Sequence, residues 1–468
     1  MRKTKIVSTI GPASNDERIL EDLIDAGVDV MRQNFSHGSF GEHAETLQNI
    51  RDLAPDLAVM MDTQGPEIRL HEVEEGTVLK EGEELKIVTD QIEGNEEVLS
   101  VDHPEINDYL TQGDKILIDD GLIELKVKKI NEHIQCEVKH GGKVLSRKSV
   151  NVPGKELGLR APTEKDREDI EFGTEHNFDY VSASFVKSSE DIEEIRDIIE
   201  ENGSDMHIIA KIEHLKAVQN IEGIIESADG VMIARGDLGV EIPASDVPVL
   251  QKEIIEKANK KEKPVITATQ MLKSMTESPR ATRAEVSDVA NAVIDGSDAV
   301  MLSEETAIGK FPVKSVEFMG EVLEKMERYL QGKGKTPLEI EDGKVDEIIA
   351  RNVWEASKKV DAEAIVVHTS SGYTAHKIAK HRPQMDIIAF TDKKTVQRKL
   401  NLLWGVEAFY SEFPEHVDDM VDKTTDFLYR KNLVEKEDTL IITAGVPAPV
   451  TGITNTLQIR EVQSILED

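Results

Sequence analysis

The sequence predicts an α/β protein: a (β/α)8 TIM barrel with an all-β domain inserted into it and a smaller α/β domain on its C-terminal side. Three observations predict this fold. Apolar strands alternate with helical patterns over the first 330 residues, and segments of alternating polarity break that rhythm between 69 and 152. A third region of strands and helices follows the Gly- and Lys-containing joint QGKGKTP at 331–337. A chain of 468 residues is long enough for two to four domains.

Eight apolar strands can be counted in the barrel region, and most of them end in polar residues. Eight parallel strands alternating with helices are typical of this barrel, in which catalytic groups lie where the strands end. The predicted strands are Thr4–Ile10, Val28–Asn34, Ala58–Asp62, Tyr180–Ser184, Ile208–Glu213, Gly230–Asp237, Pro264–Thr269 and Ala299–Ser303. Their ends carry Arg32, Asn34, Asp62, Lys211, Glu213, Asp237, Thr269 and Ser303.

The stretch from His207 to Ile242 reads as strand, helix and strand, and both strands end on charge. Because strand side chains repeat every two residues, Lys211 and Glu213 point to the same side. One helix is predicted from the apolar stripe Leu215, Val218, Ile221, Ile224 and Ile225. The second strand terminates in Arg235-Gly236-Asp237, and strands joined by one helix are normally right-handed neighbours.

At roughly 4.8 Å between strands, Glu213 and Asp237 can share a hard divalent cation, with Lys211 beside them to meet an anion. The plainer alternative makes Lys211 and Glu213 a structural ion pair and Asp237 a turn residue before Gly239.

The segment from Arg69 to Val152 predicts a small all-β domain. In KILIDDGLIELKV, at 115–127, Asp119-Asp120-Gly121 forms a turn between two apolar runs, as in a β-hairpin. A domain inserted at the catalytic face can close over the site as a lid, or it can be a structural ornament. The basic pair Arg147-Lys148 near its return favours a lid that meets phosphates.

The C-terminal region repeats the strand and helix pattern and predicts a parallel α/β domain. Its strands read AIVVHT, DIIAFT, VEAFY and TLIITA. After the first strand, the small residues Ser370, Ser371, Gly372 and Thr374 precede a helix, where backbone N–H groups can bind a phosphate. Serine and threonine also cap helices without any ligand.

Composition excludes several classes of partner. The 91 acidic and 56 basic residues leave a formal charge of −35, which repels nucleic acid and anionic membranes. No apolar run reaches the length of a membrane span, and the first residues lack the apolar core of a signal peptide. The single cysteine, Cys136, suits a reducing compartment, so we expect a cytoplasmic protein.

Long motifs in the chain resemble those of the pyruvate kinase family. They are TKIVSTIGPAS, MRQNFSHG, DTQGPEIR, IDDGLI, VNVPG, SASFV, IIAKIE, ARGDLGVEIP, ATQMLKSM, SPRATRAEVSDVANAVIDGSDAVMLS and ETAIGKFP. The resemblance covers essentially the whole chain. It implies a catalytic barrel at 1–68 and 153–330, an inserted β lid domain at 69–152 and a C-terminal α/β effector domain at 331–468.

The resemblance implies transfer of the phosphoryl group of phosphoenolpyruvate to ADP, which gives pyruvate and ATP, with Mg²⁺ and K⁺ as cofactors. Glu213 and Asp237 match the Mg²⁺ ligands, and the amides of Gly236 and Asp237 match those that approach the substrate carboxylate. Lys211 and Arg32 match residues that stabilise and clamp the moving phosphate. Both roles are electrostatic positioning.

The other functional positions are also carried over from the resemblance. Thr269 matches a residue near the methylene carbon of the substrate, and Ser303 is expected to join a proton relay there. The K⁺ ligands correspond to Asn34, Ser36, Asp62 and Thr63. The nucleotide contacts correspond to Asn34, Phe35, Ser36, His37, Arg69 and Lys148.

Regulation and assembly follow from the same resemblance. Ser370, Ser371, Gly372 and Thr374 match the effector-phosphate loop of the family, and the loop GVPAPVTGITNT at 445–456 is expected to close over the rest of the ligand. AMP or a sugar phosphate is the leading effector candidate. A homotetramer is expected. In the K⁺ site, Glu67 stands where the family carries Glu when K⁺ is required and Lys when it is not.

Four positions depart from the family pattern: Gln33, Gln64, Ala281 and Glu304. Gln64 replaces a lysine near the nucleotide, and Glu304 replaces a glycine beside Ser303, which weakens the assignment of Ser303. Two other functions stay open. One is another pyruvate or phosphoenolpyruvate barrel enzyme, such as an aldolase, in which Lys211 forms a Schiff base. The other is a ligand-sensing relative without catalysis.

Overall fold

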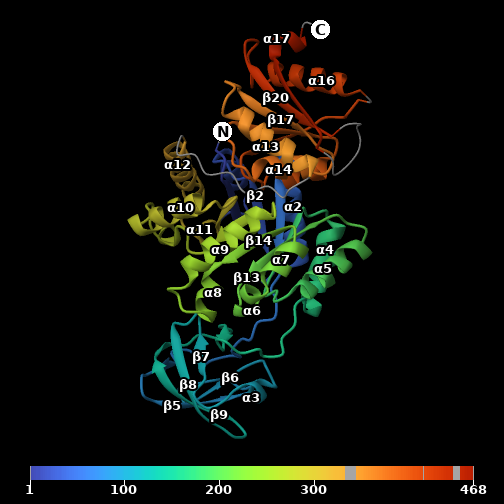
Figure 1. Cartoon of the computed structure of the whole chain (residues 1–468). Helices are drawn as coiled ribbons and strands as arrows, with labels where there is room; N and C mark the ends of the chain where they lie inside the picture. Colours follow the sequence, from blue (N-terminus) through green and yellow to red (C-terminus); the bar gives the residue numbers. More distant parts are fainter. Residues whose placement is uncertain (1, 332–343, 415, 446–453, 467–468) are drawn as a thin grey trace.

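A computed structural model of the chain describes residues 2–331, 344–414, 416–445 and 454–466. Three units follow one another along the long axis of the molecule (Figure 1). The all-β lid domain lies at one end, the barrel in the middle and the C-terminal α/β domain at the other end, with the N-terminus near the junction of the last two. The predicted linker at 331–337 lies outside the described residues except for Gln331.

The barrel is closed and parallel, as predicted. Its eight strands are hydrogen-bonded in the order β1-β16-β15-β14-β13-β12-β3-β2. Their bounds are β1 Lys5–Ile10, β2 Val30–Asn34, β3 Ala58–Asp62, β12 Tyr180–Ala183, β13 His207–Ile212, β14 Gly230–Ala234, β15 Val265–Ala268 and β16 Ala299–Leu302. The strands that carry the expected Mg²⁺ ligands are neighbours, and Lys211 pairs in register with Met232.

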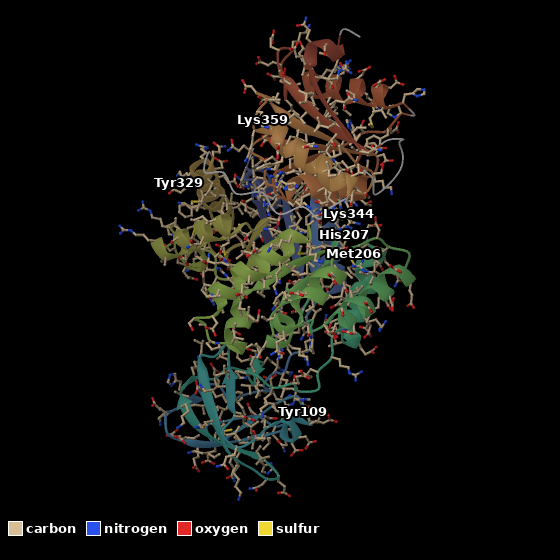
Figure 2. The ribbon with its side chains drawn as sticks, viewed as in Figure 1. Tyr109, Met206, His207, Tyr329, Lys344 and Lys359 are labelled. Carbon is tan, nitrogen blue, oxygen red and sulfur yellow. The ribbon has the colours of Figure 1, made fainter. Side chains whose placement is uncertain are left out.

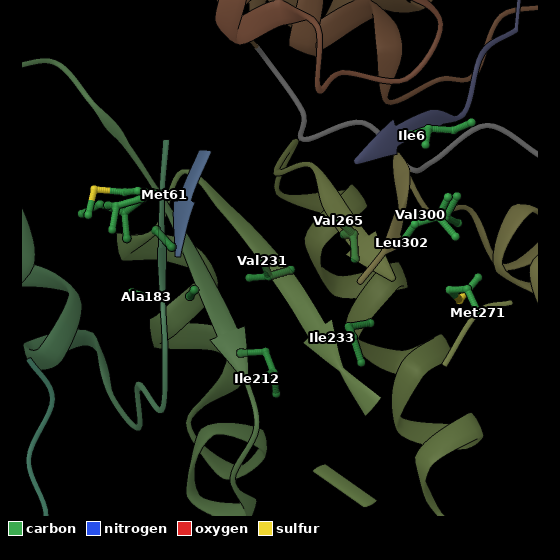
Figure 3. Close-up of a cluster of buried hydrophobic side chains, with 14 of the residues drawn as sticks. Ile6, Met61, Ala183, Ile212, Val231, Ile233, Val265, Met271, Val300 and Leu302 are labelled. Atoms are coloured by element: carbon green, nitrogen blue, oxygen red, sulfur yellow. The ribbon is translucent and has the colours of Figure 1, made fainter. Parts of the chain in front are cut away.

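Successive residues of each strand face opposite sides of the barrel wall. On β13, Ile208 belongs to the layer between strands and helices, part of which Figure 3 shows, whereas Ile209 belongs to the barrel interior. Lys211 follows Ile209 by two residues, so the period of two directs Lys211 inward as well. Leu402 of the C-terminal domain joins the interior cluster and plugs the opposite end of the barrel.

Helices surround the barrel. They are α1 Glu17–Asp25, α2 Phe40–Leu53, α4 Glu164–Glu175, α5 Ser189–Glu201, α6 Leu215–Gln219, α7 Ile221–Ser227, α8 Arg235–Glu241, α9 Val247–Lys260, α10 Arg283–Asp295, α11 Glu304–Ala307 and α12 Pro312–Leu330, with a 3-10 turn at Lys273–Thr276. The single helix predicted after Lys211 is wrong. It divides at Asn220, whose side chain donates to the Lys187 carbonyl oxygen at 2.8 Å and ties the break to the preceding loop.

The predicted end of the sixth barrel strand is also corrected. β14 stops at Ala234, and Arg235-Gly236-Asp237 forms the first turn of α8. The Arg235 guanidinium donates to the Thr269 carbonyl oxygen at 2.8 Å and pairs with Asp288 at 2.7 Å, which turns the chain away from the strand direction. Asp237 therefore reaches the mouth of the barrel from a helix and not from a strand.

The lid domain contains a six-stranded sheet in the order β11-β7-β8-β9-β5-β6 and a two-stranded sheet, β10-β4. Its elements are β4 Val78–Leu79, β5 Glu84–Val88, β6 Val98–Ser100, α3 Ile106–Tyr109, β7 Lys115–Ile118, β8 Ile123–Ile130, β9 Ile134–His140, β10 Gly142–Lys143 and β11 Val150–Asn151. The predicted hairpin is present: β7 and β8 are antiparallel, and the turn residues Asp119, Asp120 and Gly121 all have positive φ.

The C-terminal domain has a five-stranded sheet in the order β19-β18-β17-β20-β21. Its elements are α13 Val345–Ser357, β17 Ala364–His368, α14 Tyr373–Ala379, β18 Asp386–Thr391, α15 Lys394–Leu400, β19 Val406–Tyr410, α16 Val417–Arg430, β20 Thr439–Ala444, β21 Thr456–Glu461 and α17 Val462–Leu466. The four predicted strands are parallel, as expected. A fifth strand, β21, was not predicted and pairs antiparallel with β20. Within the described residues, no helix has the length and apolarity needed to cross a membrane.

Candidate active site

Lys211 lies at the centre of a buried polar cluster at the C-terminal mouth of the barrel. Its ammonium Nζ is 2.9 Å from Glu213 Oε1, 3.1 Å from Asp62 Oδ1 and 2.7 Å from Ser184 Oγ. Strand β13 supplies Lys211 and β3 supplies Asp62, while Glu213 and Ser184 follow directly on β13 and β12. The strand ends thus bring four polar side chains from distant parts of the sequence into contact.

The surrounding charges keep Lys211 protonated. Burial alone lowers the pKa of a lysine, but the carboxylates of Asp62 and Glu213 raise the pKa of Lys211 above its usual value. Asp62 is held ionised in turn: burial raises its pKa, and the larger combined effect of Arg32 and Lys211 lowers it. The cluster therefore presents a fixed positive charge at the mouth of the barrel.

Glu213 and Asp237 carry more negative charge than Lys211 offsets. Burial and the charge of Asp237 together raise the pKa of Glu213 to about 7, against the opposing effect of Lys211. Burial also raises the pKa of Asp237, with the charges of Asp120 and Glu67 acting in the same direction. The buried carboxylate of Glu213 and the half-buried carboxylate of Asp237, whose ionisation is disfavoured by burial and by like charge, fit a hard cation, which oxygen donors bind well.

Arg32 lies beside this cluster on β2. Its Nε donates to Asp62 Oδ2 at 2.6 Å and its Nη1 donates to Thr9 Oγ1 at 2.8 Å. The side chain is nearly buried, so both contacts fix the orientation of the guanidinium. A guanidinium held this way presents its remaining N–H groups in a planar fork suited to phosphate or carboxylate oxygens.

Thr269, which follows β15, and Gly236, in the first turn of α8, are hydrogen-bonded to each other. The Gly236 amide donates to Thr269 Oγ1 at 2.8 Å, and that hydroxyl donates to the Ala268 carbonyl oxygen at 2.7 Å. Thr269 has φ of 68°, a left-handed conformation that β-branched residues rarely adopt. Such strain is concentrated at functional sites, which supports a role for Thr269. The amide expected to approach a substrate carboxylate is here directed to Thr269.

Ser303 follows the last barrel strand and has an unsatisfied hydroxyl. Its Oγ is buried without a hydrogen-bond partner in the described part of the chain. Its amide donates to Glu305 Oε2 at 2.8 Å, and the other oxygen of Glu305 accepts from the Leu272 amide at 2.9 Å. Glu305 therefore fixes the backbone around Ser303 and leaves its hydroxyl available.

A cleft of about 240 Å³ separates the barrel from the lid domain. Asp237 lines it from the barrel, and Arg69 and Lys148 line it from the lid. Arg69 pairs with Glu67, and Lys148 Nζ lies 2.8 Å from Asp119 Oδ1. Arg69 and Lys148 thus face the same space as the half-buried carboxylate of Asp237. Arg147, the other member of the predicted basic pair, does not line the cleft and pairs with Glu72.

The segment from Asn34 to His37 begins at the last residue of β2 and does not line this cleft, and its residues differ in exposure. His37 is exposed and Ser36 is half-buried, whereas the ring of Phe35 is only 3% exposed and stacks on His43 at 4.0 Å between ring centroids. The Phe35 side chain belongs to the core, so its backbone alone is left to contact a nucleotide. Asn34 Oδ1 accepts from the Ser36 amide at 3.2 Å.

The remaining oxygen donors expected to hold K⁺ are buried. Asp62 is 1% exposed and Thr63 is 3% exposed, and Thr63 Oγ1 accepts from the Ser184 amide at 3.2 Å. Carboxylate, hydroxyl and amide oxygens suit a hard monovalent cation. In the described residues, no group of three or more His, Cys, Asp or Glu side chains is arranged to hold a metal ion.

The chain matches two protein-family models and several relatives of known function. A family model described as pyruvate kinase, barrel domain, matches residues 1–316, and one described as pyruvate kinase, alpha/beta domain, matches 347–460. A pyruvate kinase of Geobacillus stearothermophilus is 45% identical, covering 99% of this chain and 81% of the relative. One from Staphylococcus aureus is 43% identical with the same coverage.

A solved structure gives the same result. The crystal structure of a pyruvate kinase from Cryptosporidium parvum superposes with a TM-score of 0.89 at 39% identity, covering 98% of this chain and 96% of the other. The chain belongs to the pyruvate kinase family. It is therefore a phosphotransferase, and its barrel, lid and C-terminal domain form the pyruvate kinase fold.

The departures from the pyruvate kinase pattern can be placed in this fold. Gln33 is buried and its Oε1 lies 2.9 Å from His43 Nδ1, which places it beneath the aromatic cluster of Phe35. Gln64 is half-buried on the loop that follows β3, and Ala281 packs against the core. Glu304 opens helix α11 and pairs with Lys273 at 3.5 Å, so no unusual backbone angle is needed there.

The residues matching the effector loop of pyruvate kinases lie at the junction with the barrel. Ser370, Ser371 and Gly372 line a cavity of about 180 Å³ together with Lys393, Lys399 and the barrel residue His207. Figure 2 labels His207 at this junction. Thr374 is turned elsewhere: it is 3% exposed and its hydroxyl lies 2.7 Å from Thr454 Oγ1. The closing loop at 445–456 lies outside the described residues between 446 and 453.

Sequence reasoning missed three side chains that support the site. Ser184 contacts Lys211, Thr9 orients Arg32, and Glu305 braces the backbone at Ser303. Ser184 was within a predicted strand, and its position at the strand end was a usable signal. Thr9 and Glu305 carried no signal in the sequence, because their roles depend on contacts between barrel strands far apart in the chain.

Proposed function

We propose that this protein transfers the phosphoryl group of phosphoenolpyruvate to ADP, giving pyruvate and ATP. The observation that best supports the proposal is the protonated Lys211, held within 3.1 Å of Asp62, Ser184 and Glu213 at the barrel mouth. Phosphoryl transfer needs positioned positive charge and a cation site more than it needs a covalent nucleophile. Lys211, Arg32 and the paired carboxylates supply these features.

In this proposal Arg32 and Lys211 hold the phosphoryl group during transfer. The two contacts of Arg32 to Asp62 and Thr9 restrict its rotation, so little ordering remains to be done when phosphate arrives. Lys211 stays protonated throughout, because the negative charges of Asp62 and Glu213 raise its pKa. It therefore stabilises developing negative charge and does not act as a base.

Glu213 and Asp237 are the proposed Mg²⁺ ligands. Mg²⁺ bound there would supply charge neutralisation for the anionic substrate. The carboxylates of Glu213 and Asp237 would hold the ion at the barrel mouth, beside the Lys211 cluster and the cleft beneath the lid. The backbone amides of Gly236 and Asp237, at the start of α8, orient the substrate carboxylate once the Gly236 amide exchanges its bond to Thr269 for one to the substrate.

Protonation of the enolate is proposed to occur on the side of Thr269 and Ser303. The Thr269 hydroxyl lies between the Gly236 amide and the Ala268 carbonyl, and Ser303 Oγ is free of other partners in the described residues. A hydroxyl with an uncommitted proton can relay a proton from water to the methylene carbon. The relay delivers to the methylene carbon the proton that turns the enolate of pyruvate into pyruvate.

The nucleotide is proposed to lie in the cleft beneath the lid. Arg69 and Lys148 contact its phosphates, and Asn34, Ser36, His37 and the backbone of Phe35 contact it from the barrel. K⁺ is proposed to bind Asn34, Ser36, Asp62 and Thr63. The functional units are proposed at 1–68 with 153–330 for catalysis, 69–152 for the lid and 331–468 for regulation.

We also propose regulation by a phosphorylated effector, AMP or a sugar phosphate, at Ser370, Ser371, Gly372 and Thr374. The cavity beside this loop supports it, because Lys393 and Lys399 bring positive charge and β13 runs from its barrel wall to Lys211. A homotetramer in the cytoplasm is the assembly and location that the family implies.

The direct test is a coupled assay for ATP formation from phosphoenolpyruvate and ADP with Mg²⁺ and K⁺. A barrel aldolase is the alternative function, and it requires an unprotonated Lys211. The raised pKa of Lys211 opposes an imine. Borohydride treatment in the presence of pyruvate should leave activity and mass unchanged; trapping of pyruvate on Lys211 with no ATP formation would replace the proposed reaction with the alternative.

A further inference from the structure

A cavity of about 360 Å³ lies between the barrel and the C-terminal domain, away from the Lys211 cluster. Its barrel side includes residues of the N-terminus and of α10 and α12, and its other side includes α13 and the loop before β18. Figure 1 shows α12, α13 and the N-terminus gathered at this junction. Pockets that hold small molecules fall in this range of volume.

The lining of the cavity is net positive, whereas the chain as a whole is strongly acidic. Five cationic and two acidic side chains line it, in a protein whose formal charge is −35. The cationic residues are Arg2, Lys3, Arg328, Lys358 and Arg382, and the acidic ones are Glu324 and Glu327. Clefts lined by one sign of charge concentrate ligands of the opposite sign.

Most of these cations already have carboxylate partners, and Lys358 is the exception. Arg2, Lys3, Arg328 and Arg382 pair with Asp29, Asp386, Glu324 and Asp298. No carboxylate partner of Lys358 is found within the described ranges; its Nζ lies 3.5 Å from the ring centroid of Trp354. Lys358 is exposed at the rim, so its charge is available to a ligand entering from solvent.

His381 is an unsatisfied polar group in the wall of this cavity. It is 4% exposed, and neither ring nitrogen has a hydrogen-bond partner among the residues the structure describes. Burial lowers its pKa to about 4, so at neutral pH it has one N–H donor and one acceptor. A buried donor left unpaired costs stability, which a ligand that accepts its hydrogen bond would restore.

Both tryptophans of the chain, Trp354 and Trp404, line the same cavity. Leu330 and Val293 add aliphatic surface to it. Aromatic side chains bury large flat surfaces and favour flat apolar groups. The lining therefore combines an aromatic part, the Lys358 ammonium over the Trp354 ring with no carboxylate partner in the described residues, and the unpaired imidazole of His381.

We propose that this cavity binds a small organic anion in which a single anionic group is joined to a flat apolar body. The anionic group accepts from His381 and meets the Lys358 ammonium, while the apolar body lies against Trp354 and Trp404. The reaction at Lys211 does not require this site, so the inference stands independently of the proposed function. Because the walls belong to two domains, occupancy also fixes their relative orientation.

The test uses the full chain labelled with 5-fluorotryptophan, which gives one fluorine resonance for each of the two tryptophans. The probe 2-naphthoate should shift both resonances saturably. Acetate has only the anionic group, and 2-naphthol has only the neutral ring system. Each should bind with an affinity at least about tenfold lower than that of 2-naphthoate. Failure of 2-naphthoate to shift either resonance, or equal binding by 2-naphthol, overturns the proposal.

Charge reversal at the rim separates this site from general surface binding. Lys358→Glu changes an exposed residue, so the fold should be retained. Its affinity for 2-naphthoate, measured by calorimetry, should fall about tenfold or more. Lys359→Glu changes the adjacent exposed lysine, which does not line the cavity and which Figure 2 labels, and should leave the affinity within about twofold. Equal affinities in the two variants contradict the assignment.

Discussion

Lys211, near the end of strand β13, and Glu213, the residue that follows the strand, form an ion pair with Lys211 Nζ 2.9 Å from Glu213 Oε1. This spacing places a permanent positive charge next to a carboxylate whose ionisation is disfavoured, with a pKa of about 7. Lys211 offsets only part of the negative charge of Glu213, Asp237 and Asp62. A divalent cation at this position would neutralise the remaining negative charge. Lys211 and Glu213 therefore link anion binding to cation binding.

Glu241 predicts a measurable dependence of stability on pH. It lies in the cleft beneath the lid, 3.5 Å from His214 Nε2, and burial raises its pKa from 4.5 to about 7. The folded protein holds this proton more tightly than the unfolded chain, so the stabilisation is full below pH 4.5 and is lost as pH rises through about 7. Glu241→Gln should remove that loss.

Denaturant unfolding of both proteins between pH 5 and pH 8.5 is the measurement. The unfolding free energy of Glu241→Gln relative to wild type should increase across this range by on the order of 2 kcal/mol, from about 1.4 kcal/mol per pKa unit. A difference that stays constant with pH would show that Glu241 titrates normally in the folded protein.

The second prediction concerns K⁺. Glu67 is half-buried and pairs with Arg69; burial raises its pKa, and the charge of Glu213 acts in the same direction. A lysine here would place a fixed positive charge near the carboxylates, and this charge would replace the one that the monovalent cation otherwise supplies. Wild-type activity should require K⁺, and Glu67→Lys should lower that requirement. Glu67→Gln, which adds no charge, should not. Full wild-type turnover after rigorous removal of K⁺ and its mimics contradicts this account.

The third prediction separates the hydroxyl of Thr269 from its packing. Thr269→Ala removes the acceptor of the Gly236 amide and the proposed relay, so kcat should fall about 10²-fold with a smaller change in KM. Thr269→Ser keeps the hydroxyl and should stay within several-fold of wild type. Solvent-proton incorporation into pyruvate should slow in Thr269→Ala. An effect confined to KM would assign Thr269 to substrate binding alone.

The fourth prediction tests the effector loop. An effector acts only through unequal affinity for two enzyme states, so AMP or a sugar phosphate should lower the KM for phosphoenolpyruvate, and phosphoenolpyruvate should tighten effector binding. Ser371→Asp adds negative charge at the loop and should abolish the response. Ser464→Asp, at an exposed position of α17 in the same domain, should retain it. No response to any candidate, or a response that survives in Ser371→Asp, leaves the loop as a helix cap.

The sequence predicted most of the barrel and its central residues because their arrangement depends on local periodicity. The alternation along β13 placed Lys211 and Glu213 on one side, and the structure has the two residues in contact. Parallel strands also bring their ends together, so Asp62 could be expected beside them even though 149 residues separate it from Lys211.

Features that depend on particular tertiary contacts were not predictable. Asp237 reaches the site from α8 because Arg235 is anchored to the Thr269 carbonyl and Asp288, and periodicity does not encode that anchor. Buried and exposed residues do not alternate clearly along the antiparallel strand β21. Only its pairing with β20 identifies it as a strand of this sheet. The cavity between the domains joins Trp354 to the N-terminal residue Arg2, which no local pattern relates.

The central claim is that the charge of Lys211 carries phosphoryl transfer, and Lys211→Met tests it most directly. Removing one member of a buried charge cluster destabilises a protein by roughly 3–5 kcal/mol, so folding is checked first by thermal unfolding, with Lys216→Met at an exposed ion pair of the same region as the control. The measurement is then kcat for ATP formation beside phosphoenolpyruvate binding by calorimetry. We predict that kcat falls by about three orders of magnitude or more while phosphoenolpyruvate still binds. Turnover of the folded variant close to that of wild type would contradict the account.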